Sequence, residues 1–158
     1  MRKILGSILI LLAMATGTGA FAADNSLGTW KVNLEKTKYT PAPFPVKSLT
    51  SVREAAPGGV KVSNTGERSD GSAINASYTA KYDGTPVSVS GEGAPYDTVS
   101  LKQVDDNTFI WDAKKSDGKY HSHGRIVISP DGKTMTMRAK GTDADGKPMT
   151  ITLVYDKQ

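Results

Sequence analysis

The stretch IVISPDGKTMTMRAKGTDADGKPMTITLVYD, residues 126–156, alternates apolar and polar side chains through three segments separated by two Asp-Gly turns. Alternation with a period of two is typical of β-strands that bury one face, and Asp-Gly favours the positive φ of tight hairpin turns. A two-residue first turn sets Ile128 opposite Met135, and a three-residue second loop sets Met135 opposite Tyr155. The apolar side chains of three successive strands therefore share one face of an antiparallel sheet.

Other turns of the chain pass the same register test. Asp70-Gly71 and Asp105-Asp106-Asn107 fit three-residue loops, and Asp83-Gly84 fits a two-residue turn. The apolar pairs that these turns bring opposite each other are Val62 with Tyr78, Leu101 with Trp111, Ala80 with Val87, and Tyr78 with Val89. Each of these hairpins can therefore close with its apolar residues on one side.

The alternation predicts an all-β fold of about ten strands, joined mostly to their sequence neighbours. These strands are expected near 28–34, 47–55, 59–68, 72–82, 85–91, 96–104, 108–116, 119–129, 133–142 and 147–156. An antiparallel up-and-down meander without an amphipathic helix to cover it can bury its apolar face by closing on itself. We therefore predict a single barrel of about eight to ten strands, with the proline-rich segment 38–47 as an extended loop over one mouth.

A membrane barrel is the competing closed architecture, because an exported meander could also turn its apolar face toward lipid. Membrane barrels usually combine tight turns at one end with longer loops at the other, and they carry two aromatic girdles. Here tight turns are predicted at both ends, and aromatic residues make up 7% of the chain. The pattern therefore favours a barrel whose apolar face is turned inward.

Residues 1–22 have the pattern of a cleaved secretory signal. A basic start at Arg2 and Lys3 precedes the apolar run 4–15, and Ala20-Phe21-Ala22 is a small-x-small cleavage pattern. The apolar run of about a dozen residues is shorter than the roughly 20 needed to span a bilayer. We expect cleavage after Ala22, a single domain over residues 23–158 without a membrane span, and a periplasmic or secreted location.

The composition excludes several classes of function. Without the two basic residues of the signal, Lys and Arg fall from 20 to 18 against 16 acidic residues, so the net charge falls from +4 to +2. The lysines are scattered singly along the alternating segments, which indicates a solvated surface, and we expect no nucleic-acid partner. The chain has no cysteine, which excludes disulfides and thiol chemistry.

The motif Gly28-Thr29-Trp30, which opens the first predicted strand, resembles the G-x-W signature at the start of lipocalins. This resemblance implies a lipocalin-like β-barrel in which Trp30 packs across the closed end. The segments GTWKVNLEKTKYTP, DTVSLKQVDDNTF, ISPDGKTMTMRAKGTDADGKP and VYDKQ also make the chain similar to a group of small exported bacterial proteins without assigned activity. That second resemblance implies export and the same barrel, and it supplies no catalytic residue.

The segment KYHSHGRIVIS, residues 119–129, holds both histidines of the chain. A two-residue turn before it places His123 opposite Asp112 and His121 opposite Lys114, on the face away from the apolar residues. We therefore expect both imidazoles in solvent, with an Asp112–His123 ion pair worth about 0.2 to 1 kcal/mol. Two imidazoles and a carboxylate could also bind zinc or orient a general base. The positive side chains beside them oppose a dication, and we predict no metal site.

The leading hypothesis is a barrel that binds a small apolar or amphipathic molecule at one mouth, argued from architecture. The inward residues expected to contact this ligand are Tyr78, Trp111, Tyr120, Met137, Leu153 and Tyr155. One alternative is an enzyme or metal site that uses Asp112, His121 and His123, and another is a structural or interaction protein with a filled barrel. We expect a binding protein without a cofactor more than an enzyme. The volume of the interior separates these alternatives.

Overall fold

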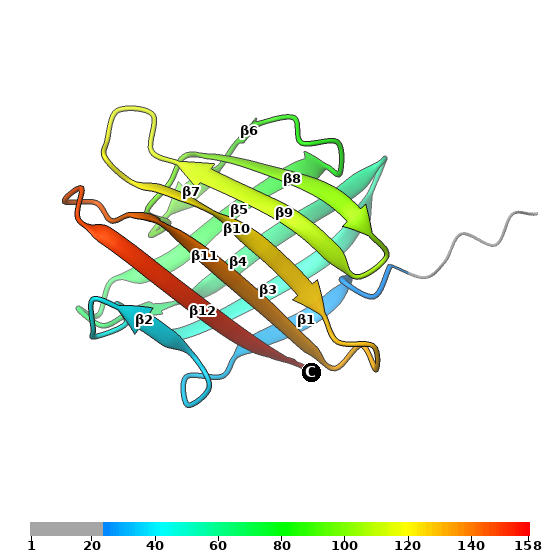
Figure 1. Ribbon diagram of the computed structural model, residues 1–158, viewed down its shortest axis with the longest axis horizontal. Coiled ribbons are helices and arrows are strands. Elements are labelled where there is room, and N and C mark those ends of the chain that lie inside the picture. Colours follow the sequence, from blue (N-terminus) through cyan, green and yellow to red (C-terminus); the bar gives the residue numbers. More distant parts are fainter. Residues whose placement is uncertain (1–23) are drawn as a thin grey trace, which may run out of the picture.

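The computed structural model describes residues 24–158, so the predicted signal segment lies outside the described residues. The described residues form twelve strands in one sheet (Figure 1). The strands are β1 (Gly28–Val32), β2 (Lys38–Thr40), β3 (Val46–Ala56), β4 (Gly59–Arg68), β5 (Ala73–Lys81), β6 (Val87–Ser88), β7 (Ser90–Glu92), β8 (Thr98–Asp105), β9 (Thr108–Lys114), β10 (His121–Ile128), β11 (Thr134–Thr142) and β12 (Pro148–Lys157). Within residues 24–158, the structure contains no helix with the length and apolarity needed to cross a membrane.

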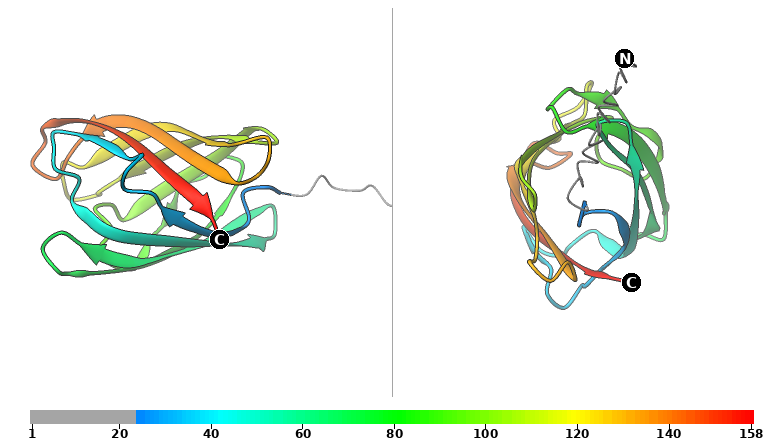
Figure 2. Two further views of the ribbon diagram at one scale, coloured as in Figure 1. Left: turned by 90° about the horizontal axis from the view of Figure 1, so that it is seen from below. Right: turned by 90° about the vertical axis from the view of Figure 1, so that its right-hand side faces the viewer.

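The strands follow the order β6-β8-β9-β10-β11-β12-β1-β3-β4-β5-β7, and β2 pairs with β12 outside this path. All the strand pairs are antiparallel, and the strands surround a common axis to form a nearly closed barrel (Figure 2). The all-β meander is therefore confirmed. The predicted number of eight to ten strands is wrong, because the sheet has twelve.

The first additional strand is β2, which lies in the segment predicted as an extended loop. β1 pairs only with the end of β12, from Tyr155 to Lys157. Residues 150–152 of β12 therefore have no partner in β1. β2 occupies this position and sets Tyr39 opposite Ile151. Because backbone donors and acceptors at a sheet edge require partners, a short strand is favoured here even though prolines follow it directly.

The second additional strand arises because the segment predicted as one strand, 85–91, is divided between two neighbours. β6 pairs with β8 and β7 pairs with β5, so the predicted pairs of Ala80 with Val87 and of Tyr78 with Val89 do not form. The turn at Asp83-Gly84 leads the chain across to β8, where the Gly84 N–H donates to the Leu101 carbonyl oxygen at 2.8 Å. The predicted hairpin therefore does not form. The segment instead connects the two ends of the sheet, because β6 pairs with β8 and β7 pairs with β5.

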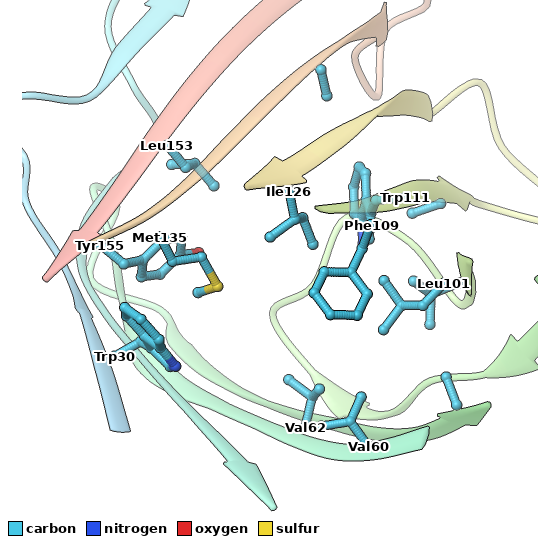
Figure 3. Packing of buried hydrophobic residues seen from close by; sticks show 14 of the residues in the cluster. Trp30, Val60, Val62, Leu101, Phe109, Trp111, Ile126, Met135, Leu153 and Tyr155 are labelled. Atoms are coloured by element: carbon cyan, nitrogen blue, oxygen red, sulfur yellow. The ribbon is translucent and has the colours of Figure 1, made fainter. Parts of the chain in front are cut away.

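The other predicted registers are confirmed. The structure pairs Val62 with Tyr78, Leu101 with Trp111, Ile126 with Met137, Ile128 with Met135, Met137 with Leu153, and Met135 with Tyr155. These turns fix the register because a slip of one residue would move every apolar side chain of a strand to the other face. The apolar side chains consequently meet in the interior, as the labelled core residues in Figure 3 show.

One end of the barrel is plugged by the segment that precedes β1. Trp30 and Ser26 are fully buried, and the Trp30 indole N–H donates to the Ser26 carbonyl oxygen at 2.8 Å. The Tyr82 hydroxyl donates to Asp24 Oδ2 at 2.7 Å, and the Tyr82 ring lies 4.9 Å from that of Phe109. Trp30 is therefore a packing residue at a closed end, as the resemblance implied.

Candidate functional site

The interior of the barrel contains a cavity of about 320 Å³. Its wall is formed mainly by inward side chains of β3, β4, β5, β11 and β12, together with residues of three connecting segments, 44–46, 93–95 and 143–145. β12 runs from Pro148, next to the last of these segments, to Lys157, which pairs with Trp30. The connecting segments therefore surround a mouth at the end of the barrel opposite Trp30.

All six residues that the sequence predicted as ligand contacts line this cavity. They are Tyr78, Trp111, Tyr120, Met137, Leu153 and Tyr155. The structure thus brings them together around one space, while their contact with a ligand stays a prediction. Ala76, a small residue of β5, also lines the cavity.

Aromatic side chains missed by the sequence reasoning complete the wall. Tyr96 contacts Trp111 edge-on, with ring centroids 5.7 Å apart, and its ring lies 6.0 Å from Tyr120. At the mouth, Tyr39 and Phe44 are 5.7 Å apart, and both line the cavity. Both belong to the segment 38–47, which was expected as an extended loop over one mouth; part of it is strand β2, and its residues line the cavity at the mouth.

Arg53 on β3 is the most unusual residue of the cavity wall. Only 4% of its surface is exposed, yet its Nε and Nη2 atoms are buried without a hydrogen-bond partner. β3 sets Arg53 opposite Val62, which is itself opposite Tyr78, so the three side chains share the inward face. A buried charged group without a partner is rare in proteins and calls for a physical explanation.

The turn between β3 and β4 is a sequence signal for the inward position of Arg53. Pro57-Gly58 is a two-residue turn between β3 and β4, and Gly58 has a φ of 70°. Because Val62 was already assigned to the inward face, this turn places Arg53 on the same face. Arg53 was overlooked because its charge is usual for an exposed strand position.

The phenols of the cavity remain protonated at neutral pH. Burial raises the pKa of Tyr78 and of Tyr155, and the positive charge of Arg53 opposes this rise in both. Burial also raises the pKa of Tyr120 to about 12 and that of Tyr96 well above its ordinary value. These tyrosines therefore offer neutral O–H groups that can donate hydrogen bonds.

The histidine cluster lies on the outer face of the barrel, as predicted. β10 sets His123 opposite Asp112 and His121 opposite Lys114. Asp112 Oδ2 contacts both rings, at 2.9 Å from His121 Nε2 and 3.3 Å from His123 Nδ1. Both imidazoles are 53% exposed, and both line an open surface hollow that Asp112 does not line. Among residues 24–158, no group of three or more His, Cys, Asp or Glu side chains is arranged to hold a metal ion.

Comparisons with known proteins give a likeness in shape only. No protein-family model and no curated protein matches the sequence. One similar solved structure is that of EF1p2_mFAP2b bound to DFHBI, with a TM-score of 0.49, 15% identity, and coverage of 87% of this chain and 97% of the other. Another is a redesigned β-barrel, mFAP1, bound to DFHBI, with a TM-score of 0.42, 17% identity, and coverage of 82% and 94%.

These likenesses assign neither a family nor a ligand to this chain. The nearly closed antiparallel barrel does not single out the lipocalins.

Proposed function

We propose that this protein binds a small apolar or amphipathic molecule inside its barrel. The observation that carries the proposal is the cavity of about 320 Å³, which has its mouth at the end opposite Trp30 and a wall of mostly aromatic and aliphatic side chains. Ligand sites in proteins typically have volumes of about 300 to 1,000 Å³, a largely apolar wall and a few convergent polar groups. The cavity has each of these properties.

The alternatives receive less support. A filled barrel would leave no interior space, whereas this barrel contains a cavity that Trp111 and Tyr155 help to line. An enzyme at Asp112, His121 and His123 would need a cleft that brings a substrate to these groups, and both histidines stand on the exposed outer face.

We also propose that the protein is an exported, lipocalin-like barrel of the periplasm or the extracellular medium. The support is the signal-like pattern of residues 1–22 and the packing of Trp30 across the closed end. The intact mass of protein recovered from the periplasm or the medium should correspond to a chain that begins at Ala23. A mass that includes residues 1–22 would contradict export through a cleaved signal.

Ligand binding is tested with the neutral fluorescent probe N-phenyl-1-naphthylamine and purified protein. We expect saturable binding of one probe molecule per barrel, accompanied by a change in tryptophan emission because Trp111 lines the cavity. Absence of saturable binding would overturn the proposal.

A pair of variants on β5 shows where the probe binds. Ala76→Phe adds a ring on the inward, cavity-lining face, and Thr79→Phe adds the same ring on the exposed outer face. We expect Ala76→Phe to abolish probe binding and Thr79→Phe to leave it unchanged. Equal binding by both variants would place the probe outside the cavity.

A further inference from the structure

We infer that the ligand of this cavity is an amphipathic monocarboxylate whose carboxylate binds the Arg53 guanidinium inside the barrel. The inference rests on the proposed function and adds the chemical class of the ligand. It is carried by the position of Arg53, by the two donor atoms that it leaves free, and by the apolar character of the remaining wall.

Within the part of the chain that the structure describes, Arg53 has no charged partner that would explain its burial. Among residues 24–158, none of the ion pairs includes Arg53, and its Nε and Nη2 donors are buried without acceptors. The acidic residues that line the cavity, Asp143 and Asp145, lie in the segment 143–145 at the mouth. Asp143 Oδ1 there accepts hydrogen bonds from the backbone N–H groups of Asp145 and Lys147, at 2.9 and 2.8 Å. The described residues therefore place a cation in the interior and form no ion pair with it.

The two unsatisfied donors form one edge of the guanidinium, the edge that pairs with carboxylates. Nε–H and the neighbouring N–H of Nη2 project in parallel from one edge of the guanidinium plane, and a carboxylate accepts both in a bidentate pair. Tyr78 and Tyr155 line the same cavity as Arg53. Their neutral O–H groups can donate hydrogen bonds to a polar group of a ligand in this cavity.

The charge of the site favours a monoanion. The other arginine of the wall, Arg68, donates from Nη1 to the Gly93 carbonyl oxygen at 2.8 Å near the mouth, where the carboxylates of Asp143 and Asp145 also line the cavity and offset its charge. A single guanidinium balances one negative charge, whereas a phosphate monoester would bring a second charge into a largely apolar space.

The body of the ligand must be apolar, because the cavity between Arg53 and the mouth is lined by aliphatic and aromatic residues. Leu49, Ile74, Met137, Ile151 and Phe44 belong to this wall. An aliphatic and an aromatic body both fit this chemistry, and the experiment distinguishes them.

The test compares a carboxylate with a neutral molecule of the same chain length. Dodecanoate and dodecan-1-ol, each below its aggregation limit, displace N-phenyl-1-naphthylamine from delipidated protein at neutral pH. We expect dodecanoate to bind about tenfold or more tightly than the alcohol, the factor that a charge-assisted hydrogen bond typically supplies. Naphthalene-2-carboxylate, in a parallel titration, shows whether an aromatic body is preferred to the aliphatic one.

Variants assign the preference to Arg53. Arg53→Met and Arg53→Gln should bind dodecan-1-ol at least as well as the unmodified protein and lose the preference for dodecanoate. Arg138→Met, a control on the exposed outer face of β11, should keep that preference. Far-UV circular dichroism and urea unfolding establish that each variant is folded.

The outcomes separate this inference from the proposed function. Saturable probe binding without any preference for the carboxylate, or a preference that survives in both folded Arg53 variants, overturns the inference and leaves the proposed function intact. Absence of probe binding overturns both.

Discussion

We expect replacement of Arg53 by methionine to make the ligand-free protein more stable. Two donor atoms of the guanidinium are buried without partners, and an unsatisfied buried donor typically costs about 1 to 3 kcal/mol. Both atoms belong to one delocalised group and share its desolvation penalty, so the two costs do not add fully. Methionine keeps an unbranched stem that can pack along the same wall. We therefore expect the free energy of unfolding to rise by about 2 kcal/mol.

Urea unfolding of delipidated protein at neutral pH measures this difference. The midpoint should move to a higher urea concentration with an unchanged slope, because the variant exposes nearly the same surface on unfolding. Arg138→Met, on the outer face, should stay within about 0.5 kcal/mol of the unmodified protein. A loss of more than about 1 kcal/mol in Arg53→Met, at equal slope, would refute the reasoning, since it would mean that Arg53 makes stabilising interactions within the protein.

Three further predictions concern the core and the outer surface. Leu101→Ala should lower the free energy of unfolding by about 2 to 5 kcal/mol in urea, because the leucine is fully buried, and a loss below about 1 kcal/mol would contradict the assigned core. The Ser116 backbone N–H, 2.9 Å from Asp97 Oδ1, lowers the pKa of Asp97 to about 2, below its unfolded value. The stabilisation from this carboxylate is therefore complete above about pH 4 and is lost as the pH falls toward about 2. Melting temperatures of Asp97→Asn should consequently fall less over that interval than those of the unmodified protein, and parallel curves would exclude the effect. His121→Ala and His123→Ala should each change the free energy of unfolding by less than about 1 kcal/mol. Added zinc should not raise the melting temperature, and a rise that either variant abolishes would establish a metal site.

Turn chemistry explains why most of the barrel could be predicted from the sequence. The loops around Gly71, Asn107, Gly132 and Gly146 each connect neighbouring strands in a fixed register, and all four registers are as predicted. A local rule is sufficient there because both partners of each pair lie within one hairpin. The same hairpin registers turn the six predicted contact residues inward, where they line one cavity.

The predictions failed where pairing depends on distant parts of the chain. Asp83-Gly84 has the composition of a hairpin turn, but closing the barrel requires the residues after it to reach β8. The pairing of β2 likewise depends on how much of β12 is left open by β1. Neither condition can be read from a window of neighbouring residues, because both result from the closure of the whole sheet.

Arg53 shows that the position of a residue in a strand, and not its polarity, decides which face it occupies. A two-residue turn at Pro57-Gly58 fixes β3 against β4, so the register that turns Val62 inward also turns Arg53 inward. The same register turns Arg68 inward, and both arginines line the cavity. Arg68 donates to the Gly93 carbonyl oxygen and so helps to hold the segment at the mouth. Arg53 has no such acceptor for Nε and Nη2. The hydrogen bond of Arg68 explains its inward position by a structural role. The inward position of Arg53, whose Nε and Nη2 have no acceptor, is best explained by an anionic ligand.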